Sequence, residues 1–161
     1  MEYEEITKKL NSLIQLDIDA IHAYEQAMKN INEVFIRDQL AEFRNDHHRH
    51  FRELSAVVQG MGGSPPEYSP DFKGFLIQGF TALRSMTGTE GALKAMESNE
   101  KLTNKTYEEA SSWDLPLDAI SLVRSNFDDE KLHIRYIQTS LRDRIWEGRG
   151  TPTKPGDEAR L

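Results

Sequence analysis

The sequence predicts an all-α fold, an antiparallel four-helix bundle with a central crossover that contains a short extra helix. Apolar residues recur at helical spacing over four long stretches of the chain. No useful length alternates apolar and polar residues with the period of two that a half-buried strand shows. The Gly- and Pro-rich stretch GMGGSPPEYSP (60–70) separates the first two helical stretches from the rest. Four long helices with one extended connection in the middle indicate a bundle with a crossover.

The four long helices follow from the apolar periodicity and its interruptions. Gly60 ends the second helical stretch, and Thr87 with Glu90 fits a capping box that begins the third. The expected ranges are roughly 3–31, 35–59, 89–112 and 114–146.

The crossover contains the apolar segment DFKGFLIQGFTALRSM (71–86), which predicts the short extra helix. Ser69 followed by Pro70 is a suitable cap and first turn for it. The segment lacks the Lys/Arg-rich polar face of a membrane-surface helix, so we expect it to pack against the bundle or against a second subunit. The sequence therefore leaves open whether the protein forms a homodimer.

Length and composition indicate one domain. The chain has 161 residues, which is enough to bury a real core, and a formal net charge of −7. We expect the bundle to occupy residues 1–147 and the tail 148–161, rich in Gly, Pro and charge, to be flexible. The acidic balance argues against non-specific nucleic-acid binding.

Cysteine is absent, which excludes disulfides, thiolate metal sites and a thiol nucleophile. The N-terminal residues MEYEEITKKL lack the basic-then-apolar order of a signal peptide, and no apolar run approaches membrane-spanning length. We therefore expect a cytoplasmic protein with neither a membrane nor a nucleic acid as its partner.

The inward stripe of each predicted helix is interrupted by ionisable residues near its middle. Such stripes repeat at alternating steps of three and four. In the second helix, for example, His47 and His50 lie on the stripe between Phe43 and Leu54. Six ligand-type residues are expected to converge at one level of the core: Asp17, His47, His50, Glu100, Glu130 and His133.

An internal repeat connects these residues at a constant offset of 83 positions, as between Tyr24 and Tyr107. The first two helices thus resemble a diverged copy of the last two. The related pairs are Asp17 with Glu100, Tyr24 with Tyr107, Asp46 with Asp129, His47 with Glu130, and His50 with His133.

A divalent metal is the simplest partner for these groups. A carboxylate in an apolar core costs several kcal/mol unless it is paired, protonated or bound to a cation. Carboxylate oxygens combined with imidazole nitrogens suit iron first, with manganese or zinc as alternatives, and three histidines disfavour calcium. The alternative for any one of these residues is a buried polar group satisfied by hydrogen bonds or water.

Three further ionisable residues are expected outside the site. His48 lies about 100° around the helix from His47, toward solvent, and His22 points away from Asp17 and is expected at the surface. Glu97, one turn before Glu100, is a fallback ligand that breaks the repeat.

The other repeated pairs allow two readings each. Asp46 and Asp129 lie at the edge of the stripe, where we expect a solvated face; the alternative is that they orient ligand imidazoles. Tyr24 and Tyr107 either only pack in the core or also reach site carboxylates with their hydroxyls.

With these residues in view, the chain resembles the ferritin-like superfamily over about residues 5–145. Glu130-Lys-Leu-His133 is the Glu-x-x-His of that superfamily's di-iron bundles, and Glu100 lies seven residues before Tyr107, as in rubrerythrin-type helices. The segments LDIDAIHAYEQA and LTNKTYEEA are most similar to a bacterial ferritin-like family of four-helix-bundle proteins of unknown function.

The resemblance implies roles for the six residues. Asp17 and Glu100 would be terminal carboxylates, Glu130 a bridge, and His50 and His133 terminal imidazoles. His47 stands where a bridging Glu is expected, so it would either bind one metal or replace the bridge. Asp17 is also one methylene shorter than Glu. These departures make a mononuclear site, or a zinc site without a redox role, an alternative to di-iron chemistry.

Two functions therefore stay open. The first is a ferritin-like metal-binding protein with ferroxidase- or peroxidase-like activity at a dinuclear iron or manganese centre. The second is a non-enzymatic, stress-associated bundle with a structural metal or none, acting as a binding or assembly protein. Metal content and Fe(II) oxidation would discriminate between them.

Overall fold

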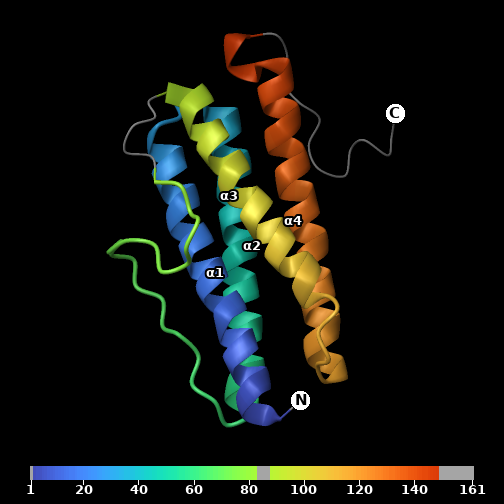
Figure 1. Ribbon diagram of the computed structural model, residues 1–161. Coiled ribbons are helices and arrows are strands. Elements are labelled where there is room, and N and C mark those ends of the chain that lie inside the picture. The colour runs from blue at the N-terminus through green and yellow to red at the C-terminus, as the bar shows by residue number, and fades with distance from the viewer. Residues whose placement is uncertain (1, 83–87, 149–161) are drawn as a thin grey trace.

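The computed structural model describes residues 2–82 and 88–148, and it confirms the predicted all-α four-helix bundle (Figure 1). Within these ranges there is no strand. No described helix combines the length and apolar character needed to cross a membrane. The helices are α1 (Tyr3–Lys29), α2 (Val34–Gly60), α3 (Gly88–Ala110) and α4 (Leu117–Asp143), followed by the short 3-10 helix η2 (Ile145–Glu147).

The long crossover sets the helix directions. In Figure 1, α1 rises from the N-terminal end and α2 returns beside it, after which the crossover climbs back along the bundle before α3 begins. α3 therefore runs antiparallel to α1, and α4 runs antiparallel to both α2 and α3. Each helix packs against two others: α1 against α2 and α3, and α4 against α3 and α2. The four inward stripes thus face one shared core.

Two apolar clusters fill the core on either side of a polar layer. One includes Ile36, Leu40 and Leu93, and the other includes Leu10 and Leu54. All five side chains are fully buried, and burying a side chain of this size is worth about 1.5–3 kcal/mol. The polar layer is therefore held between two well-packed apolar segments of the bundle.

The predicted short helix over 71–86 is wrong for the part that the structure describes. Residues 71–82 form bends and turns, while 83–86 lie outside the described residues, as does the expected capping residue Thr87. Gly74 and Gly79 have φ values of +108° and +105°. These angles are incompatible with a right-handed helix, and glycine adopts them without steric cost.

Side chains of the bundle bind the amides that a helix would have used internally. The backbone N–H groups of Leu76 and Ile77 donate to Asp19 Oδ2 at 3.0 and 2.6 Å. That of Thr81 donates to Asn99 Oδ1 at 2.6 Å. Three apolar side chains of the segment still pack onto the two core clusters, as expected, whereas Leu76 is exposed. The three are Phe75, Ile77 and Phe80.

The C-terminal end of the bundle has a left-handed residue, Arg144, with φ 48°, between α4 and η2. The indole of Trp146 packs on the first apolar cluster. Of the tail expected at 148–161, only Gly148 belongs to the described residues.

Candidate metal centre

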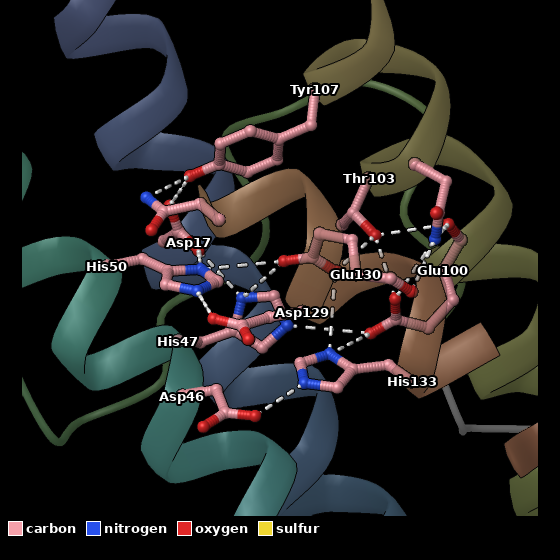
Figure 2. Close-up of polar contacts among 12 residues, drawn as sticks. Asp17, Asp46, His47, His50, Glu100, Thr103, Tyr107, Asp129, Glu130 and His133 are labelled. Atoms are coloured by element: carbon pink, nitrogen blue, oxygen red, sulfur yellow. Dashed lines mark hydrogen bonds and ion pairs between the residues drawn. The ribbon is translucent and has the colours of Figure 1, made fainter. Parts of the chain in front are cut away.

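The structure brings all six predicted residues together in the middle of the bundle (Figure 2). Each helix presents one or two of them inward, and every one is at most 1% exposed. α1 and α3 carry one carboxylate each, α2 carries two histidines, and α4 carries a Glu and a His. They are Asp17, Glu100, His47, His50, Glu130 and His133.

The six residues form two overlapping groups, in each of which one donor atom per residue lies within 4.8 Å of all the others. The Asp17 group consists of Asp17, His47, His50 and Glu130, and the Glu100 group consists of Glu100, His47, Glu130 and His133. His47 and Glu130 therefore belong to both groups. The arrangement therefore offers two neighbouring four-ligand positions that share two residues.

In the first group, Asp17 lies at the centre of the contacts. Its Oδ1 is 2.7 Å from His47 Nδ1 and 3.1 Å from His50 Nδ1. Its Oδ2 accepts a hydrogen bond of 2.5 Å from the hydroxyl of Tyr107. Tyr107 thereby holds one carboxylate oxygen and leaves the other toward the imidazoles.

In the second group, Glu100 has the same role. Its Oε1 lies 3.5 Å from both His47 Nε2 and His133 Nδ1, and it accepts a 2.5 Å hydrogen bond from the hydroxyl of Tyr24. The Thr103 hydroxyl lies 3.0 Å from Glu100 Oε2 and 3.1 Å from Glu130 Oε2. Both tyrosines thus reach site carboxylates across the bundle, which decides between the two readings of these residues.

The expectation that Asp46 and Asp129 lie on a merely solvated face is wrong, because each carboxylate contacts an imidazole of the site. His50 Nε2 lies 2.8 Å from Asp129 Oδ2, and His133 Nε2 lies 2.8 Å from Asp46 Oδ2. Because each carboxylate accepts a hydrogen bond from Nε2–H, Nδ1 is the nitrogen that faces the site, where it can supply a lone pair to a metal once its proton has left. Arg49 also pairs with Asp129.

These contacts occur in pairs related by the 83-residue offset. The hydrogen bond from Tyr24 to Glu100 matches the one from Tyr107 to Asp17. The contact of Asp129 with His50 likewise corresponds to that of Asp46 with His133. In each pair the two halves of the chain exchange partners, so that neither half completes its own part of the site.

Of the five buried side-chain atoms without a hydrogen bond in the described part of the chain, two belong to the site: Glu130 Oε1 and His133 Nδ1. Glu130 Oε1 faces His47 Nδ1 at 3.4 Å without forming a hydrogen bond. Leaving such atoms unpaired in the core costs about 1–3 kcal/mol each. Both are lone-pair donors that suit a divalent transition metal, so the residues present fit a metal ion at this position.

The charges of the site stabilise one another. Burial alone would lower the pKa of His47, but the charge of Glu130 and the hydrogen bond to Asp17 raise it to about 10. Burial would raise the pKa of Glu100, yet its interactions with the nearby imidazoles of His133 and His47 hold that pKa well below its usual range. Burial dominates for Glu130, whose pKa is raised. A cation entering the site therefore competes with protons on the imidazoles.

His22 is not a surface residue, contrary to the sequence-based expectation. It is 7% exposed, and its ring lies 5.4 Å from that of Tyr68 and 5.3 Å from that of Phe72. Both aromatic residues belong to the crossover, which covers the outer face of α1. A continuous row of apolar residues on this outer face of α1 would have indicated that the face is buried, but the face also carries Asp19.

The remaining candidates lie outside both groups. His48 is half-buried with its ring 5.1 Å from that of Tyr68, and Glu97 pairs with Lys101 at 3.9 Å. Thr103, whose hydroxyl contacts Glu100 and Glu130, was not expected from the sequence as a partner of the site. Its place on the inward stripe between Glu100 and Tyr107 was the available signal.

Comparisons with solved structures agree with this architecture. A two-domain protein from Anabaena variabilis, with DJ-1/ThiJ/PfpI-like and ferritin-like domains, matches 96% of this chain at a TM-score of 0.73 and 13% identity. The match spans 41% of that protein's length. A ferritin-like, diiron-carboxylate protein from Bacillus anthracis matches 88% of this chain and 99% of its own at a TM-score of 0.67 and 17% identity.

These likenesses confirm the ferritin-like fold that the residues suggested. A search of curated proteins gave no match. The family that matches the sequence is DUF2383, a domain of unknown function, over residues 5–112, which include α1, α2, the crossover and α3. The chain belongs to the DUF2383 family.

Proposed function

We propose that this protein binds divalent transition-metal ions in the core of its bundle. The observation that carries the proposal is a pair of buried atoms that could each bind a metal and that form no hydrogen bond, Glu130 Oε1 and His133 Nδ1. They lie among six ligand-type side chains. A cation would bind both atoms and would compensate the negative charge of the three buried carboxylates.

Five of the six ligands have a clear orientation for this role. Asp17 and Glu100 would bind as terminal carboxylates, since a tyrosine hydroxyl holds each of them. His50 and His133 would bind through Nδ1, because a carboxylate outside the site accepts the Nε2 proton of each ring. Glu130 would lie between the two positions.

Iron is the ion we propose first, with manganese and zinc as alternatives. Mixed carboxylate and imidazole ligands suit all three ions. Bound iron would supply one-electron redox chemistry, with dioxygen or a peroxide as the oxidant. The protein would hold the ligands in place and, with every ligand buried, limit the access of water. The structural neighbour from Bacillus anthracis is a diiron-carboxylate protein, which supports the same choice.

One observation favours the second candidate function, a bundle with a structural metal and no redox activity. His47 provides imidazole where the resemblance implies a bridging carboxylate, so three carboxylates rather than four are present to neutralise two close cations. A zinc ion would be compatible with this lower charge.

Elemental analysis of protein purified without added metal, followed by aerobic Fe(II) oxidation, tests both candidates. We expect bound iron and oxidation of Fe(II) above the buffer rate. Zinc without iron turnover would support the structural alternative. Metal far below one ion per chain, unchanged by reconstitution, would refute metal binding.

Variants test the site itself. His133→Ala and Glu100→Ala should lower the metal content because each removes a proposed ligand. His48→Ala is the matched control, since His48 lies outside both groups. Equal losses in all three variants would contradict the assignment.

A further inference from the structure

We propose that His47 joins two metal ions, one bound at each ring nitrogen, so that an imidazole bridge lies opposite the carboxylate bridge of Glu130. The inference rests on the proposed function and deepens it, because it assigns the residue that departs from the expected di-iron pattern.

The first argument is the position of the ring. His47 Nδ1 lies 2.7 Å from Asp17 Oδ1, in the first group, while Nε2 lies 3.5 Å from Glu100 Oε1, in the second. In Figure 2 the ring lies between the Asp17–His50 side and the Glu100–His133 side, with one nitrogen turned toward each. The side chain thus spans the two positions.

Second, within the described part of the chain, both nitrogens of His47 contact carboxylates of the site and neither has a polar partner outside it. His50 and His133 each direct Nε2 to an outer carboxylate, Asp129 and Asp46 respectively, which leaves one nitrogen for a metal. Among the described residues, the acidic partners of His47 are all site carboxylates, Asp17, Glu100 and Glu130, and the ring is fully buried. Both nitrogens are therefore available for ligation.

The third argument is the relation between His47 and Glu130. The two residues are 83 positions apart and are the two members shared by both groups. Glu130 also faces both sides, with Oε1 3.6 Å from His50 Nδ1 and Oε2 3.5 Å from His133 Nδ1. Two residues at equivalent places in the repeat would thus serve as the two bridges, one through oxygen and one through nitrogen.

Binding at both nitrogens has a defined proton balance. With its pKa raised to about 10, the His47 ring carries an N–H at each nitrogen before a metal binds. Each ion that binds displaces one of these protons: the N–H bond breaks, its electron pair forms the metal–nitrogen bond, and the proton leaves to solvent, so that two bound ions release two protons. A ring between two ions also separates them more than the ~3.5–4 Å typical of dinuclear sites. Imidazole ligation favours copper, zinc, iron or nickel over magnesium and manganese.

Copper(II) titration of the full chain tests the bridge directly. We expect wild-type protein to bind about two copper ions per chain and His47→Gln to bind about one, because a second ion would lose a strong nitrogen ligand. His47→Ala is a second variant, and circular dichroism checks that each variant keeps its helices. His48→Ala is the matched control and should behave as wild type.

Electron paramagnetic resonance of the fully loaded protein gives an independent readout. A bridging imidazole couples two copper(II) ions magnetically, so the wild-type signal should be weaker than that of two isolated ions. Two ions in His47→Gln, coupled as in wild type, would overturn the bridge, and so would a single ion in wild type. Either result leaves metal binding intact, whereas no bound metal in folded wild-type protein would refute the proposed function itself.

Discussion

Replacing Asp129 by Ala is expected to weaken metal binding although Asp129 is not a proposed ligand. Asp129 Oδ2 accepts the Nε2 proton of His50 at 2.8 Å, which keeps Nδ1 free to face Asp17. Without this acceptor, the imidazole loses its fixed tautomer and part of its basicity. The substitution would also remove one of the two carboxylate partners of the Arg49 guanidinium, which lies 3.5 Å from His50 Nε2 and would keep only Asp46, at 3.6 Å.

The expected loss of metal affinity depends on how exposed to water the carboxylate is. Loss of a carboxylate that orients a metal-bound histidine costs about 10–100-fold in metal affinity, which corresponds to about 1.4–2.8 kcal/mol. The side chain of Asp129 is 25% exposed and that of Asp46, its equivalent beside His133, is 36% exposed. We therefore expect about tenfold for Asp129→Ala and a smaller loss for Asp46→Ala, since water screens the more exposed pair.

Competition of the protein with a chromophoric chelator for zinc measures this difference. Asp128→Ala is the matched control, because Asp128 is the preceding residue on α4, is 72% exposed and pairs with Lys131 at 2.9 Å rather than with a histidine of the site. Equal zinc affinities for Asp129→Ala and Asp128→Ala would refute the reasoning that the outer carboxylates orient the imidazoles.

Three other outcomes are expected. Tyr107→Phe keeps the ring but leaves Asp17 Oδ2 without its donor, which should lower the free energy of unfolding in urea by about 1.5–3 kcal/mol; an unchanged value would contradict the role of this hydroxyl. Asp19→Ala removes the acceptor of the Leu76 and Ile77 amides and should cost about 1–3 kcal/mol, whereas Asp19→Asn keeps an oxygen there and should cost less; equal losses would contradict this. Zinc at about 100 times its Kd should stabilise the fold by about 2.7 kcal/mol, seen as a calorimetric rise in Tm that a chelator reverses; no rise would contradict binding to the native state.

The inward residues of each helix could be predicted because a helix has one repeat that depends only on local geometry. The sequence placed Asp17, Glu100 and Glu130 on inward stripes, and the structure buries all three at one level. The stripe was less accurate at the end of α2: a step of three after Leu54 predicts Val57 as the inward residue, whereas the structure fully buries Val58 and only partly buries Val57. Small errors of angle accumulate along a helix, since 3.6 residues per turn does not match steps of three and four.

The crossover could not be predicted from its own composition. Its apolar residues suited a helix, but Asp19 on α1 and Asn99 on α3 bind its amides, and glycines take angles that a helix does not allow. The same segment covers His22, which local periodicity had placed at the surface. Burial on the outer face of α1 depends on a segment about fifty residues away in the chain.

The sequence by itself determined four helices, their inward faces and the six residues that converge in the core, because helical periodicity and the cost of burying charge are local properties. Only the tertiary structure decided which residue contacts which across the bundle. Asp46 on α2 orients His133 on α4, Tyr107 on α3 holds Asp17 on α1, and both nitrogens of His47 face site carboxylates. Such pairings depend on how helices pack and rotate against one another, which no single helix encodes.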